Sequence, residues 1–185
     1  MSRWKFMWGP GLAVLILSGC GAPAQSSADY PHYDRASLLS EATLIIEGVS
    51  VAVESSVLIP RYTGETPEQN PVLGLSADDK QKALGEADGI EATAVTFRIA
   101  KVHRGDARPG DEVLIIQTNV SEEVPLQVSR KYLLFTRDGL EGTFTILGAS
   151  AGAYVSSGDE SFTAVSPEDA PYTTITSSEI AALAG

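Results

Sequence analysis

Residues 93–103 constrain the fold more than any other stretch of this chain. Apolar side chains occupy every second position from Val95 to Ile99, which is the period of a half-buried β-strand. The next apolar residue then comes out of phase, at Val102. One extra residue in the strand would restore the alternation, so the sequence predicts a β-bulge near residues 100–101.

A second change of phase occurs at Gly48. Between residues 41 and 53, Leu44 and Ile46 share one face with Gly48, and Val49, Val51 and Val53 share the other. A glycine at such a switch indicates a bulge or sharp bend, and a plain strand buried on both faces is the equally weighted alternative. Two bent strands favour a small barrel, because closing a barrel requires strong local curvature.

Short strand-like runs recur through the rest of the chain, separated by turn sequences such as Asp138-Gly139. This pattern predicts an all-β fold, specifically a small antiparallel barrel with short flanking helices. The further strands are expected at 112–118, 131–136, 143–147, 153–156 and 161–165, and the helices at 34–40, 76–84 and 176–183. Asp34, Ser76 and Thr176 are the expected N-caps.

Residues 54–89 are predicted to be a long loop insertion in the barrel, because prolines and glycines interrupt any regular strand there. Loops of this length are uncommon and are often functional or disordered. We expect this insertion to contact a partner, with Arg61, Tyr62 and Leu73 as candidate anchors.

Basic residues are scarce, and they gather locally at Arg98, Lys101 and Arg104, followed by Arg108. They are expected either to pair with surface carboxylates, which is the favoured interpretation, or to form a small anion-binding face. The formal net charge of the whole chain is −11. This balance argues against nucleic-acid binding, which depends on Lys and Arg to neutralise phosphates.

The N-terminus has the pattern of an export signal. Arg3 and Lys5 precede a short apolar run that ends in the letters LSGC at 17–20. These four residues resemble the bacterial lipobox. The resemblance implies that residues 1–19 are a signal peptide, that Cys20 receives the lipid, and that 20–33 form a tether. The protein is then expected on the extracytoplasmic face of a cell membrane, held there by the lipid anchor.

Three motifs give the predicted barrel a second resemblance. They are TFRIAKVHRG at 96–105, GDEV at 110–113 and KYLLF at 131–135. Together they resemble the OB-fold domains of netrins and tissue inhibitors of metalloproteinases, and related bacterial envelope proteins, over residues 42–147. The framework disulfides of that family are absent, because Cys20 is the only cysteine. A lipid on Cys20 would also block the N-terminal cysteine chemistry by which those inhibitors act.

Motifs for catalysis are weak. The letters GASAG at 148–152 match a nucleophile elbow around Ser150, but strand-like residues follow where a helix is required. His32 is expected in the tether, and His103 on the surface at a strand end. Two histidines without a third ligand near in sequence are too few for a metal site. We therefore expect no catalytic residue, metal or cofactor.

The sequence thus predicts one barrel domain at 34–185 that acts as a non-catalytic binding or scaffolding module of the cell envelope. Its expected partners are the membrane, through Cys20, and an envelope protein. The alternatives are an envelope hydrolase, with Ser150 or paired acids as its catalytic groups, and a metalloprotease inhibitor.

Overall fold

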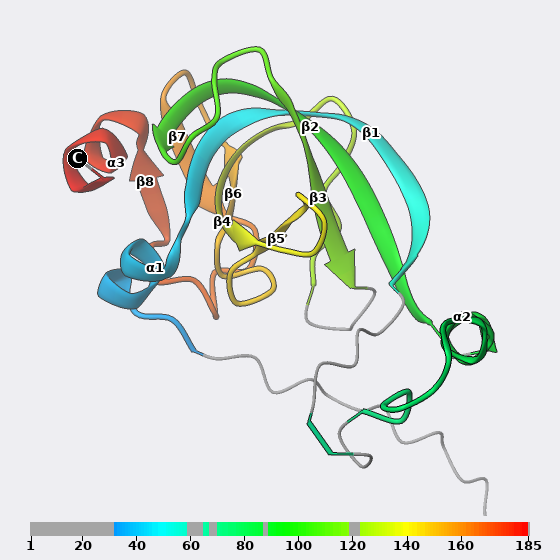
Figure 1. The fold of residues 1–185 in the computed structure, drawn as a ribbon. Helices are drawn as coiled ribbons and strands as arrows, with labels where there is room; N and C mark the ends of the chain where they lie inside the picture. The colour runs from blue at the N-terminus through cyan, green and yellow to red at the C-terminus, as the bar shows by residue number, and fades with distance from the viewer. Residues whose placement is uncertain (1–31, 59–64, 67–69, 87–88, 119–122, 185) are drawn as a thin grey trace, which may run out of the picture.

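The described part of the chain forms a strongly curved sheet with three short helices around it (Figure 1). The computed structural model describes residues 32–58, 65–66, 70–86, 89–118 and 123–184. In this part of the chain the strands are β1 (Leu44–Leu58), β2 (Ile90–Arg104), β3 (Glu112–Thr118), β4 (Lys131–Asp138), β5 (Phe144–Ile146), β6 (Ala153–Ser156), β7 (Ser161–Ala164) and β8 (Thr174–Thr176). The helices are α1 (Arg35–Glu41), α2 (Ala77–Glu86) and α3 (Ser177–Ala184).

The first five strands form a partly closed ring. Their order is β1-β2-β3-β5-β4, and β4 also pairs with β1. The sheet then continues from β4 through β6 and β7 to β8. The mostly β architecture is confirmed, but the sheet is mixed rather than antiparallel, because β3 and β5 run parallel where Ile115 meets Phe144.

The sheet packs two hydrophobic clusters, one on each face of β1 and β4. Alternate residues of a strand point to opposite faces, so Leu134 enters one cluster and Leu133 the other. The first cluster is built mainly from the five ring strands, with Ile46, Phe97, Ile99 and Ile115 among its members. The second is completed by α1, α3 and the last strands, with Leu38, Phe162, Ile175 and Ile180 among its members.

Bulges bend the long β1–β2 pair. Glu47 pairs with Lys101 and Gly48 with Ile99, so Ala100 is the extra residue. This confirms the predicted bulge near residues 100–101. The change of phase at Gly48 lies at the same irregularity, where a Cβ on Gly48 would lie 2.1 Å from the carbonyl oxygen of Arg98. Gly48 therefore lets β2 approach β1 closely where the ribbon bends.

Two further register shifts leave His103 and Val51 as extra residues. Strand β1 also runs to Leu58, beyond the predicted strand end at residue 53. The first residues of the predicted insertion therefore belong to a regular ribbon with the start of β2.

The three helices begin at the predicted caps. The Asp34 side chain accepts a hydrogen bond from the backbone N–H of Ser37, at 2.8 Å, and Ser76 caps α2 through Asp79. The backbone N–H of Thr176 donates to Glu179 at the start of α3, completing a capping box with the Thr176 hydroxyl. In Figure 1, α1 and α3 lie near β8, whereas α2 lies beyond the far end of the β1–β2 ribbon.

Candidate functional site

The far end of the β1–β2 ribbon exposes apolar side chains to solvent. In the described part of the chain, five of the ten exposed large hydrophobic residues belong to the ribbon or to the segment between its strands. We call these five the ribbon apolar residues. They are Val53, Val57, Leu73, Leu75 and Ile90. Val53 and Val57 share one face of the ribbon, whereas Ile90 pairs with Leu58 and points to the other face. An exposed apolar patch is typical of an interaction surface, and Val53 and Val57 are the same-face pair here.

Leu73 is the one predicted anchor of the insertion that the structure describes. It is 45% exposed and lies in a turn just before α2, closed by a hydrogen bond from its backbone N–H to the carbonyl of Asn70. The other two predicted anchors, Arg61 and Tyr62, lie outside the described residues. The predicted lipidation site Cys20 also lies outside them.

The three predicted basic residues of β2 have separate partners. Arg98 forms an exposed ion pair with Glu112, its cross-strand neighbour on β3, at 2.8 Å. Arg104 donates to the backbone carbonyl of Leu39, near the end of α1. Lys101 donates to the hydroxyl of Ser177, at 2.6 Å. Pairing with a carboxylate thus holds for Arg98, while the other two side chains contact α1 and α3.

A buried polar cluster lies where β1, β2 and β4 meet the start of α3. Its centre is Glu47, whose carboxylate receives His103 Nε2 at 2.8 Å and Lys131 Nζ at 3.2 Å. The side chains of Glu47 and His103 are only 4% and 1% exposed. The Lys131 ammonium also lies over the ring of Phe162, 5.1 Å from its centroid.

The prediction of His103 as a surface residue is therefore wrong. His103 is the extra residue of a bulge, and bulges re-aim side chains. Its imidazole lies against Glu47 rather than in solvent.

Burial alone would raise the pKa of the Glu47 carboxyl, because it disfavours the charged form. Hydrogen bonds from Ser177, His103 and Lys131 outweigh this effect and hold the pKa below its ordinary value. Glu47 is thus a buried carboxylate that joins three strands to α3. Its contacts serve to hold the fold together, because its partners come from three other elements, β2, β4 and α3.

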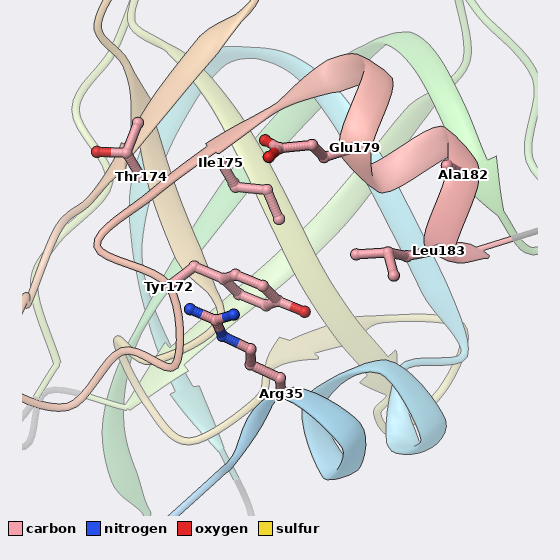
Figure 2. Close-up of a pocket in the computed structure, with 7 residues that line it drawn as sticks. All are labelled: Arg35, Tyr172, Thr174, Ile175, Glu179, Ala182 and Leu183. Atoms are coloured by element: carbon pink, nitrogen blue, oxygen red, sulfur yellow. The ribbon is translucent and has the colours of Figure 1, made fainter.

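A groove opens between α1, β8 and α3 (Figure 2). Its volume is about 380 Å³, within the range of pockets that hold small ligands. We call it the α1–α3 groove. Its lining residues are Arg35, Tyr172, Thr174, Ile175, Glu179, Ala182 and Leu183.

The cation of the α1–α3 groove is fixed in place. The guanidinium of Arg35 lies over the ring of Tyr172, 4.8 Å from its centroid, and its Nε donates to the carbonyl of Pro171 at 3.2 Å. Burial raises the pKa of Tyr172, so the ring stays a neutral platform.

A second hollow, of about 580 Å³, has an acidic lining. Its carboxylates belong to Asp106, Asp111, Glu112 and Asp138. Three of them contact the protein itself: Asp111 accepts from the backbone N–H of Arg108, Asp138 accepts from Thr43, and Glu112 pairs with Arg98. These acids mainly fix turns and strand ends.

The predicted nucleophile Ser150 is buried, with 3% of its surface exposed. Its hydroxyl oxygen accepts a hydrogen bond from the backbone N–H of Val124, at 2.7 Å. A strand, β6, follows it at Ala153 instead of a helix. Ser150 therefore lacks the exposed strand-to-helix turn of a nucleophile elbow.

The residues of the α1–α3 groove were not found by sequence reasoning. Arg35 and Tyr172 are far apart in the chain, and no spacing rule connects them. Glu179 also takes part in the capping box at the start of α3, where Thr176 is the predicted N-cap. A signal was nonetheless present, because Arg35 is one of only 13 basic residues in an acidic chain.

Two negative findings apply to the described residues. No three His, Cys, Asp or Glu side chains among them are arranged to hold a metal ion. No helix among them combines the length and apolar character that crossing a membrane requires. A scan against protein-family models and a search of curated proteins found no match to this chain.

Proposed function

We propose that this protein is a lipid-anchored, extracytoplasmic binding module that contacts an envelope partner through the segment between β1 and β2. The observation that carries the proposal is the concentration of exposed apolar side chains on the ribbon and its insertion. Val57 and Ile90, near its end, are 60% and 51% exposed. Leaving such residues in water gains nothing for the fold, whereas a partner that covers them gains about 25 cal/mol per Å² of apolar surface.

The strand order supports an OB-like interpretation of the ring. The order β1-β2-β3-β5-β4, with β4 returning to β1, suits a five-stranded, partly open Greek-key barrel. OB-folds bind ligands with the loops between strands 1 and 2 and between strands 4 and 5. The segment between Leu58 and Ile90 would be the first of these loops, which makes it the natural contact element.

The membrane part of the proposal rests on the lipobox-like letters LSGC at 17–20. We expect the mature protein to begin at Cys20 and to carry a diacylglycerol on its thiol. Mass spectrometry of the N-terminal peptide, isolated from the membrane fraction, tests this directly. An unmodified thiol on Cys20 would remove the anchor from the proposal.

The binding part is tested by crosslinking in intact cells. The full-length protein is compared with a variant that lacks residues 60–89, and we expect a partner that is captured by the first and lost with the second. Because a deletion also changes the chain connection, a double variant, Val57→Ser with Leu73→Ser, repeats the test on two exposed side chains.

Val128→Ser is the matched control, since Val128 is 51% exposed but lies outside the ribbon and its insertion. Capture that survives both the deletion and the double variant would rule out the β1–β2 segment as the contact element. Capture lost equally with Val128→Ser would point to a general loss of solubility or folding.

A further inference from the structure

The α1–α3 groove contains a cation whose hydrogen-bonding capacity is only partly used. The Nε of Arg35 donates to Pro171, and the guanidinium plane lies over Tyr172. Its two terminal nitrogens have no hydrogen-bond or ion-pair partner among the residues that the structure describes. A guanidinium held in one orientation presents these donors as a fork that suits a carboxylate.

The same groove contains an anion on another wall. Oε2 of Glu179 accepts from the backbone N–H and the hydroxyl of Thr176, at 2.8 and 2.7 Å. Its other oxygen has no hydrogen-bond partner within the described ranges. The hydrogen bonds from Thr176 lower the pKa of Glu179, and the field of Arg35 adds to this effect, so the carboxyl group is ionised at neutral pH.

These two charges influence each other but do not touch. No ion pair joins Arg35 to Glu179 within the described part of the chain. Figure 2 shows them at opposite sides of the groove, with Ile175 and the ring of Tyr172 between them. A cation and an anion separated by apolar side chains form a complementary frame for a ligand that has both charges.

The lining of the groove combines polar groups with aliphatic side chains. Ile175 is 2% exposed and contributes to the second hydrophobic cluster, so it forms a rigid wall. Leu183, on α3, is 48% exposed and stands at the rim. Apolar lining with a few oriented polar groups is the usual composition of a small-molecule site.

We propose that the α1–α3 groove binds an aliphatic zwitterion of amino-acid or dipeptide size. Its carboxylate would bind Arg35, its ammonium group Glu179, and its side chain the aliphatic surface that Ala182 and Leu183 expose on α3. The net charge of −11 favours this ligand over a simple anion, because a zwitterion has no net charge to be repelled. The inference does not depend on the insertion or on the partner proposed above.

The test measures binding to the full-length protein in detergent by isothermal titration calorimetry at pH 7. The probes are L-leucine, N-acetyl-L-leucine, which lacks the ammonium, L-leucinamide, which lacks the carboxylate, and the dipeptide Leu-Leu. We expect saturable binding of leucine or Leu-Leu, with the acetylated and amidated forms each about tenfold weaker than leucine. Whichever of leucine and Leu-Leu binds with the lower Kd shows whether the groove suits an amino acid or a dipeptide.

Two variants test which charge of the groove binds which end of the ligand. Glu179→Gln keeps an acceptor for the cap of α3 but removes the charge, so the preference for leucine over N-acetyl-leucine should disappear. Arg35→Gln should abolish the preference for leucine over leucinamide. Arg98→Gln, which removes a cation on β2 paired with Glu112, is the matched control and should change neither preference.

Thermal unfolding of each variant shows whether it is folded. The proposal is overturned if none of the four probes binds saturably to the intact protein. It is also overturned if folded Glu179→Gln and Arg35→Gln variants keep the preferences of the unaltered chain, because the two charges then do not orient the ligand.

Discussion

The two halves of the β1–β2 ribbon belong to the same pair of strands but differ in burial and regularity. From Leu44 to Ser50, β1 is almost entirely buried, and its register with β2 shifts at bulges. From Ala52 to Leu58 the register is regular and most side chains are exposed. The first half also pairs with β4, which the second half does not.

The difference shows which half the fold requires. In the first half, bulges place His103 and Lys101 beside the buried Glu47 cluster and keep the ring closed. In the second half, Val53 and Val57 leave 39% and 60% of their surface exposed to solvent. We infer that changes in the first half act on stability, and that changes to the exposed side chains of the second half act on binding.

The largest effect is expected for Glu47→Ala. It leaves His103, Lys131 and Ser177 without their shared acceptor, and breaking a buried ion pair costs about 3 to 5 kcal/mol. We expect the free energy of unfolding to fall by an amount near the lower end of this range, because Lys131 is 35% exposed and water can solvate its ammonium group in the variant. Urea unfolding followed by circular dichroism measures it.

Glu112→Ala serves as the control for Glu47→Ala. Glu112 pairs with Arg98 on the surface, where an ion pair contributes about 0 to 1 kcal/mol. Equal losses for the two variants would mean that burial of the Glu47 cluster has no energetic consequence.

The next effect in size is expected for Gly48→Ala. The new Cβ would lie 2.1 Å from a backbone oxygen and 2.6 Å from the ring of Phe97, so the strands must move apart. Overpacking of this kind costs about 1 to 3 kcal/mol. Gly158→Ala is the matched control, because no atom lies within 4 Å of the added Cβ. A Gly48→Ala protein as stable as Gly158→Ala would show that the bend does not need a glycine.

A smaller, pH-dependent effect follows from the lowered pKa of Glu47. Between its ordinary value of 4.5 and the lower folded-state value, the unfolded chain binds the proton more readily. The stability from this group is therefore present above about pH 4.5 and is lost as pH falls through the folded-state pKa. Glu47→Gln removes the ionisable group, so the stability gap between the two proteins should narrow from pH 6 to pH 3 in urea unfolding. A stability gap that stays constant or widens over this pH range would contradict a lowered pKa of Glu47 in the folded protein.

Local patterns in the sequence predict much of this fold. The caps at Asp34, Ser76 and Thr176 and the bulge at Ala100 depend on a few adjacent residues, so they are visible without the structure. The strand β8 was missed, because three residues before a helix carry no measurable period. The parallel contact of β3 with β5 was also missed, since it depends on how the ring closes.

The candidate sites were harder to predict, because they depend on contacts between distant segments. His103 is adjacent in sequence to surface-like residues, and only the bulge that turns it towards Glu47 reveals its burial. Arg35 and Tyr172 meet because α1 and the chain before β8 pack on the same cluster. By contrast, exposure of Leu73 was predictable from the surrounding turn residues.

The smallest effect is expected for Val57→Ala, in the exposed half of the ribbon. Val57 is 60% exposed, so its truncation should change the free energy of unfolding by less than about 0.5 kcal/mol. Val95→Ala makes the same chemical change on a fully buried ribbon valine and should cost about 1 to 3 kcal/mol. If thermal unfolding gave similar losses for both, the exposed half would have to contribute to the fold through its side chains. Its apolar residues would then no longer be free to serve as a binding surface.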